Sequence, residues 1–276
     1  MTVTEKDWLA AHPYLQPVAE FHAIAEAAVD AVLNARCCVT NWNDHLDEFH
    51  AGVPLLRSSK SIIDLKPVEE TVPSLIEKLA SMTLPNKLGE DMRGLALDLR
   101  QIPAGSTGIM AWLLDENGPA VSHRGLLRYV GWITVAKYLS KVVAAFDRWR
   151  DEERWLRSYC PLCGSSPAMA QLAGVDPARM RLLSCGCCGT CWRFRRIACP
   201  FCENEDDHRL ATLAIEGEDS LRIDCCESCN GYIKTYVGAG NEHLMLSDWS
   251  SLHLDVIAQD QGLKRMADSL YALIPT

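Results

Sequence analysis

Eleven of the thirteen cysteines in this 276-residue chain lie between residues 160 and 229. Disulfide frameworks are typical of small secreted chains, whereas such a cluster in a longer chain usually binds metal. Eight of the cysteines form four Cys-x-x-Cys pairs, which are Cys160/Cys163, Cys185/Cys188, Cys199/Cys202 and Cys226/Cys229. Two such pairs can turn back so that four thiolates surround one ion. The spacing therefore predicts two mononuclear Cys₄ metal sites, each built from two consecutive pairs.

The third pair has two possible registers, because Cys185/Cys188 and Cys188/Cys191 are both spaced correctly. The residue after the second ligand usually adopts a left-handed conformation, which favours glycine or asparagine. The first register places Gly189 there, whereas the second places the bulky Trp192 there. The first and fourth pairs are likewise followed by Gly164 and Asn230. We therefore expect Cys185 and Cys188 to be the ligands.

Four thiolates in a tetrahedron suit zinc and iron alike, so we expect two ions per chain, iron or zinc. A complete Cys₄ set leaves no open coordination position, and the chain has no phosphate-binding loop or nucleophile elbow. We expect no catalytic residues, and thus no enzyme. Cys37 and Cys38 are expected to be small buried hydrophobes. For Cys187, Cys191 and Cys225, beside the sites, a role as exchange thiols is the less favoured interpretation.

The pattern of apolar residues changes from helical to strand-like at Tyr159. Three- and four-residue spacing predicts helices over Pro17–Arg36, Val72–Ala80, Thr107–Glu116 and Ser122–Arg157. Short strands are predicted over Leu210–Ile215, Leu221–Asp224 and Tyr232–Val237. A C-terminal helical segment can bury Leu252, Val256, Leu263, Met266 and Leu270. The fold class is therefore α+β: a helical domain (1–157), two rubredoxin-like or zinc-ribbon modules (158–198 and 199–246) and a C-terminal helical segment (247–276).

The net charge of −9 and the pI of about 5.4 argue against binding of nucleic acid or an anionic membrane. No secretory or membrane-spanning segment is evident, so we expect a cytoplasmic protein without membrane insertion. Basic Arg193–Arg196 and acidic Glu203–Asp207 lie close in sequence, which suits docking to a protein. The charged run Asp147–Arg157, which includes Trp149 and Trp155, is expected to be a solvated helix face rather than a partner surface.

The order of these features resembles the formate dehydrogenase accessory protein FdhE family. The resemblance is carried by the segments Tyr159–Pro167, Leu183–Trp192, Ala198–Cys202 and Cys226–Lys234, and by the spacing of Asp248, Leu252, Leu254 and Asp255. It implies two rubredoxin-like modules behind a helical domain, with the same eight cysteines as ligands. It also implies a cytoplasmic factor that contacts the catalytic subunit of a respiratory formate dehydrogenase and is needed to form the active enzyme.

Two interpretations from other classes remain open. A rubredoxin-type electron-transfer protein would require iron and a reversible potential. A nucleic-acid-associated zinc ribbon would require zinc and salt-sensitive binding.

Overall fold

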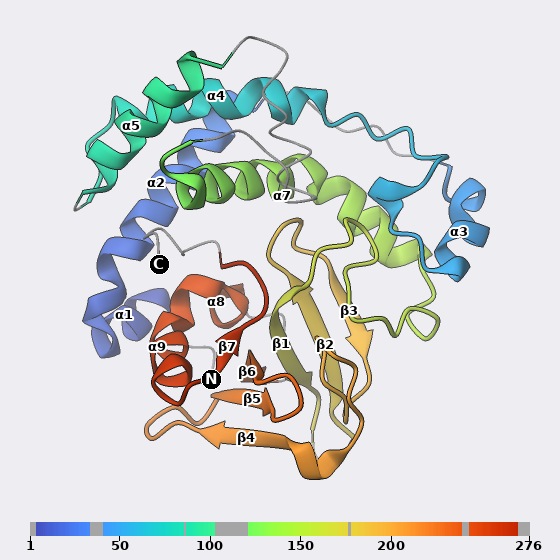
Figure 1. The fold of residues 1–276 in the computed structure, drawn as a ribbon. Helices are drawn as coiled ribbons and strands as arrows, with labels where there is room; N and C mark the ends of the chain where they lie inside the picture. The colour runs from blue at the N-terminus through green and yellow to red at the C-terminus, as the bar shows by residue number, and fades with distance from the viewer. Residues whose placement is uncertain are drawn as a thin grey trace.

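The computed structural model describes residues 4–33, 41–85, 87–102, 121–175, 178–238 and 243–269. The predicted helix over Thr107–Glu116 and the cysteines Cys37 and Cys38 lie outside these residues. In the described part, helices arch over one side of a β-sheet, and the C-terminal helices pack beside the sheet (Figure 1). The mixed α+β class expected from the sequence is confirmed.

The N-terminal half supplies the arch. Its helices are α1 (Glu5–Ala11), α2 (Gln16–Val32), α3 (Leu46–Ala51), α4 (Lys66–Ala80), α5 (Leu88–Arg100) and α7 (Arg124–Trp149). Short 3₁₀ turns connect them at η1 (Pro13–Leu15), η2 (Trp42–His45) and η3 (Leu55–Arg57). Pro17 lies in the first turn of α2, where a missing N–H costs nothing. α7 is buried along most of its length, including Leu127, Val130 and Leu139, so it forms the centre of the helical layer.

The long predicted helix ends earlier than expected, at Trp149. Arg150 turns to an extended conformation (φ −68°, ψ 145°), and its guanidinium pairs with Asp147 and donates to the carbonyl of Cys191. The following residues form turns, so the expected helix face over Asp147–Arg157 is wrong beyond Trp149. Trp155 is 1% exposed and stacks on Phe49 at 5.0 Å between ring centroids. It is a core residue, because it faces the helices rather than solvent.

The two cysteine-rich modules share one sheet, in the order β3-β2-β1-β6-β5-β4, and β7 pairs in parallel with Gly231 and Tyr232 at the start of β6. The first module supplies β1 (Pro167–Ala173), β2 (Met180–Cys185) and β3 (Cys191–Phe194). The second supplies β4 (Leu210–Ala214), β5 (Leu221–Cys226) and β6 (Gly231–Val237), at the positions predicted from alternation. Neighbouring strands within a module are antiparallel, whereas β1 and β6 pair in parallel from Met169↔Lys234 to Leu172↔Val237. This parallel pair joins the modules.

The C-terminal segment folds as α8 (His243–Leu246), η5 (Asp248–Ser251), α9 (Leu252–Asp260) and β7 (Lys264–Arg265). The helix expected to continue through Leu263 and Met266 is wrong beyond Asp260. Gly262 adopts a left-handed conformation (φ 74°) that ends the helical turn, and Lys264 then donates its backbone N–H to the carbonyl of Asn230. The chain therefore returns to the sheet as a short strand.

Two buried clusters hold these layers together. One joins the helices to the first module, and it includes Trp155, Cys160 and Trp192. The other joins α1 to the second module and α9, through Trp8 and Leu254. Both clusters contain residues from either side of residue 157, where the sequence places a domain boundary. The division into four domains stays a prediction.

A buried ion network fixes the C-terminal segment to β6. Lys234, 1% exposed, places its Nζ 2.6 Å from Asp248 Oδ1 and 2.8 Å from Asp255 Oδ2. Arg265 reaches the same two carboxylates at 2.9 and 2.5 Å. Burial alone would raise the pKa of Asp248, but Arg265 and Lys234 outweigh it and hold this pKa well below its usual range. Two cations and two anions thus neutralise one another in the interior.

Candidate metal centres

The first group of cysteines brings together Cys160, Cys163, Cys185 and Cys188, all buried, with their sulfurs within 4.8 Å of one another. Cys160 Sγ lies 3.5 Å from Cys188 Sγ, and Cys163 Sγ lies 3.4 Å from Cys185 Sγ. A disulfide would need about 2.0 Å. Metal–sulfur bonds of about 2.3 Å give a regular tetrahedron edges of about 3.8 Å. The spacing therefore fits four ligands around one ion and excludes disulfides between these pairs.

The second group repeats this arrangement with Cys199, Cys202, Cys226 and Cys229. Cys199 Sγ lies 3.7 Å from Cys229 Sγ, and Cys202 Sγ lies the same distance from Cys226 Sγ. In both groups the first cysteine of one pair faces the second cysteine of the other. The two modules thus present two four-sulfur sites that can each hold a metal ion. That these eight cysteines are the metal ligands remains a prediction.

The backbone of each pair explains why the sulfurs converge. The residue after the second cysteine is left-handed in all four pairs, as Gly164 (φ 85°), Gly189 (φ 75°), Glu203 (φ 58°) and Asn230 (φ 57°). In the first three pairs its N–H donates to the carbonyl of the first cysteine at 2.9–3.1 Å, which closes the turn. Glycine makes this conformation easy. Glu203 adopts the same left-handed conformation although it has a side chain that disfavours it. A preference for glycine or asparagine would therefore not have identified this position from the sequence.

The two sites differ in their exposure. The first lies under the helical layer, where Leu55 and Leu56 donate backbone N–H groups to the carbonyls of Pro161 and Leu162 at 3.0 and 2.8 Å. The second lies beside the turn between β5 and β6 in the other module, and Cys202 is exposed there. The first site is therefore part of the main core, whereas the second is open to solvent and to other molecules.

The chemistry of the first site favours a bound cation. Burial raises the pKa values of the Cys185 and Cys188 thiols well above their usual range. Hydrogen bonds, first from Cys160, lower the pKa of Cys163. Without a cation, four thiolates in this interior would repel one another and lack solvation, whereas a divalent ion compensates for both. The donor set thus fits zinc or iron.

The remaining described cysteines do not have activated thiols. Burial raises the pKa of Cys191 to about 11 and raises that of Cys225 as well. A hydrogen bond with Cys163 and burial raise the pKa of Cys187. Exchange reactions need a thiolate, which a raised pKa disfavours. A role of these three cysteines as exchange thiols stays a prediction.

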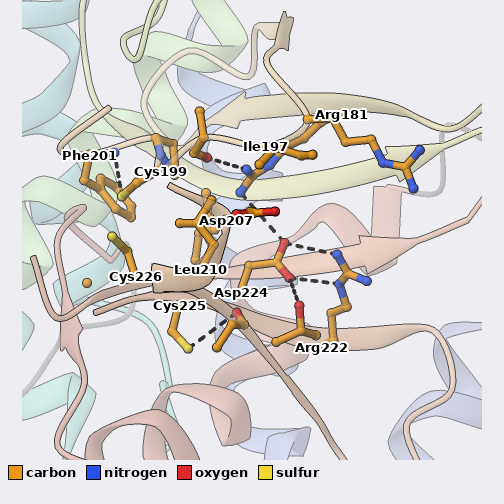
Figure 2. Close-up of a pocket in the computed structure, with 17 residues that line it drawn as sticks. Arg181, Ile197, Cys199, Phe201, Asp207, Leu210, Arg222, Asp224, Cys225 and Cys226 are labelled. Carbon is orange, nitrogen blue, oxygen red and sulfur yellow. Dashed lines mark hydrogen bonds and ion pairs between the residues drawn. The ribbon is translucent and has the colours of Figure 1, made fainter. Parts of the chain in front are cut away.

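A cavity of about 220 Å³ lies beside the second site, where the two modules meet (Figure 2). Asp224 projects into it from β5 and pairs with Arg222, whose Nε lies 2.9 Å from Oδ1. Arg181, from β2 of the first module, donates to the carbonyl of Ala198 at 2.7 Å and reaches Asp224 at 3.8 Å. These charges link the modules and flank Cys199 and Cys226. The cavity walls are thus tied to the second site.

The basic and acidic segments singled out in the sequence are connected through Arg195. Arg195 contacts both Glu203, at 3.5 Å, and Glu205. Arg193 pairs with Glu153 of the segment after α7. These arginines therefore help to fix the modules rather than standing ready for a partner. Exposed acidic side chains, such as Asp207 and Glu227, remain around the second site.

The helices lie over a single sheet, and each half of that sheet carries one four-cysteine site. The chain is therefore a protein with a helical N-terminal region and two zinc-ribbon-like modules. No family model matches it. It is 35% identical to a protein FdhE homolog of Aquifex aeolicus over 131 residues, which is 45% of this chain and 46% of that protein. It is 33% identical to the homolog of Pseudomonas aeruginosa over 42% of this chain and 40% of that protein.

The longer match, to the FdhE homolog of Shewanella oneidensis, is 29% identical over 200 residues, or 72% of this chain and 62% of that protein. The matched stretches thus cover between two fifths and about three fifths of the length of these relatives. The crystal structure of the FdhE protein from Pseudomonas aeruginosa has the same fold, with a TM-score of 0.63 at 21% identity over 95% of this chain and 90% of that one. The chain is thus similar in sequence to FdhE proteins over part of its length, and it shares the fold of one of them over nearly all of it.

Within the parts of the chain that the structure describes, none of the helices combines the length and apolar character needed to cross a bilayer.

Proposed function

We propose that this protein is a formation factor for a formate dehydrogenase and binds the catalytic subunit of that enzyme in the cytoplasm. The observation that carries the proposal is the pair of four-cysteine sites on one continuous sheet, in a chain similar to FdhE proteins. Closed sites of this kind stabilise a surface and leave no open metal position for a substrate. These two sites therefore support binding rather than catalysis.

The surface around the second site is the docking surface in this proposal. Cys202 is exposed there, and Asp207 and Glu227 give the surroundings a negative potential. Negative side chains with incomplete local pairing steer a partner that carries a basic patch. The first site, enclosed by the helical layer, instead holds the sheet in place. The two sites thus have different tasks within one docking module.

The resident ions are iron or zinc, one in each site. Bound to four thiolates, either ion would cross-link two turns that bury little apolar surface of their own. Metal analysis and a visible spectrum of protein purified without oxygen distinguish the two. One ion per chain, or a bridged cluster, would contradict the proposal of two mononuclear sites.

The test of function is genetic and biochemical. Deleting the gene should abolish respiratory formate dehydrogenase activity, and a plasmid copy should restore it. Tagged protein should co-purify with the catalytic subunit and not with nucleic acid. The double variant Asp207→Asn/Glu227→Gln should weaken this capture and reduce its salt dependence. The matched control, Glu70→Gln/Glu90→Gln, removes two charges from α4 and α5 and should leave capture unchanged. Full enzyme activity in the deletion strain would refute the proposal.

Rubredoxin-type electron transfer is the second candidate, and the exposed Cys202 favours it because electron transfer needs a ligand near the surface. It requires iron in the second site and a reversible one-electron reduction. A protein that contains only zinc, or whose iron cannot be reduced and reoxidised, would eliminate this candidate.

A further inference from the structure

We propose that His12, Glu218 and His253 form a third metal site, which takes a divalent transition metal of the zinc class. This site uses nitrogen and oxygen ligands, so it differs chemically from both thiolate sites. Their donor atoms lie within 4.8 Å of one another. His12 Nε2 lies 2.6 Å from Glu218 Oε1, and His253 Nε2 lies 3.1 Å from the same oxygen. Two imidazoles and one carboxylate are a known catalytic zinc set.

The three ligands come from distant parts of the chain. His12 follows α1, Glu218 lies in the turn between β4 and β5, and His253 lies in the first turn of α9. Their side chains are only 13%, 8% and 14% exposed. Partly buried groups keep fixed positions and are poorly screened by solvent. The site therefore has fixed ligand positions and a carboxylate whose negative charge is weakly screened, and both favour a bound cation.

The arrangement of protons argues for a cation between these groups. His12 Nδ1 lies 3.0 Å from the carbonyl oxygen of Trp8, which can only accept, so Nδ1 carries a proton. In neutral His12 the lone pair is then on Nε2, and it faces a carboxylate oxygen that also accepts. Two acceptors at this distance repel unless a proton lies between them or a metal ion binds both. Protonated His12 is thus the competing occupant.

The surroundings hold the ring of His12 in the orientation that a ligand needs, whereas the buried Nδ1 of His253 has no hydrogen-bond partner within the described residues. A backbone carbonyl bound to Nδ1 is the usual outer partner of a metal-bound histidine, because it fixes the tautomer and leaves Nε2 free. Trp8 stacks on His12 with ring centroids 4.0 Å apart, and the rings of His12 and His253 stack at 5.0 Å. A tetrahedral ion with bonds of about 2.0–2.1 Å needs donor atoms about 3.3 Å apart. His253 Nε2 and Glu218 Oε1 are already near this spacing at 3.1 Å, whereas His12 Nε2 must move away from the 2.6 Å contact when the metal binds.

A three-ligand site leaves a fourth position for water or another ligand. Glu218 and His253 line a groove of about 580 Å³, together with Tyr14, Ile215 and Val256. The fourth position can therefore be reached through an apolar groove. A metal in this site would tie α1 to the second module and to α9, the elements that share the second buried cluster.

The test is a metal titration of the full-length protein with both Cys₄ sites already filled. Added Zn²⁺ should bind at one further equivalent and raise the thermal midpoint. Added Co²⁺ should give weak visible bands without new thiolate charge transfer. Glu218→Gln and His253→Gln should weaken this binding by more than the roughly 10- to 100-fold that loss of an outer partner costs. The matched control His208→Gln, an exposed histidine beside Asp207, should bind the third equivalent as before.

The outcomes distinguish a bound metal ion from a proton on His12. Binding of only two ions by the wild-type protein under saturating Zn²⁺ would overturn the proposal, and protonated His12 would then account for the contacts. Equal binding by wild-type protein and Glu218→Gln would also overturn it. The titration of the wild-type protein shows by itself whether a third ion binds. The test therefore remains decisive even if a variant fails to fold.

Discussion

Replacing Lys234 with methionine should destabilise the protein far more than loss of a surface lysine. Lys234 Nζ contacts Asp248 Oδ1 and Asp255 Oδ2, and it also donates to the carbonyls of Asp248 and Ser251 at 3.1 and 3.3 Å. Methionine keeps the length of the side chain but removes the charge and all four contacts. The buried network then holds two carboxylates against the single cation of Arg265.

Breaking a buried ion pair by removing one partner costs about 3–5 kcal/mol, because a charge is left without compensation. We expect Lys234→Met to lower the free energy of unfolding by this amount. Lys66 provides the control, because it pairs with Glu70 at 3.7 Å with both side chains mostly exposed. Exposed pairs contribute about 0–1 kcal/mol, so Lys66→Met should change little.

The two variants are compared by denaturant unfolding, followed by tryptophan fluorescence, with metal content measured in parallel. Acid provides a second readout. A carboxylate with a lowered pKa stabilises the fold above its unfolded pKa of about 3.9, and this contribution is lost as pH falls through the folded pKa. Lys234→Met should move that loss to a higher pH. A destabilisation no larger than that of Lys66→Met would refute the reasoning.

Three further predictions concern the sites. A chromogenic chelator should remove metal from the second site before the first, because only the second exposes a ligand, Cys202; equal release rates would contradict this. Gly189→Ala should lower the free energy of unfolding by about 1–2 kcal/mol, because alanine is strained in the left-handed conformation of this residue. The variant should keep its metal, since an added Cβ meets nothing within 4 Å. An unchanged denaturation midpoint would contradict this. Cys163→Ser should loosen the helical layer as well as the first module, whereas Cys202→Ser should loosen only the second, as limited proteolysis can measure; identical cleavage patterns would contradict this.

The grouping of the cysteines was accessible from sequence because it depends on local geometry. A pair two residues apart and the left-handed residue after it, such as Gly189, belong to one turn. The same rule could not identify Glu203, whose conformation is imposed by its turn rather than by its own preference. The strands of the second module were equally predictable, because Tyr232–Val237 is a short run that alternates aromatic and aliphatic residues. The structure buries this strand on both faces, which the alternation does not indicate.

The features that sequence could not predict depend on long-range contacts. The parallel pairing of β1 with β6 joins Met169 to Lys234, and no local signal specifies such a partner. Trp155 was assigned to a charged surface because its neighbours are charged, but tertiary packing places it against Phe49. The convergence of His12, Glu218 and His253 has no sequence signature, because the three positions are far apart.

The second buried cluster has a consequence for the order of events during synthesis. Trp8 donates its indole N–H to the carbonyl of Ser250 at 3.0 Å, so one of the first helices to be made packs against one of the last. Ribosomes add about 5–20 residues per second, so the nascent chain carries Trp8 without its native cover for many seconds. The first module, complete by Phe194, can close around its ion during that interval. If that module binds its ion as predicted, metal supplied during translation would give the second half of the sheet a completed β1 edge on which to pair.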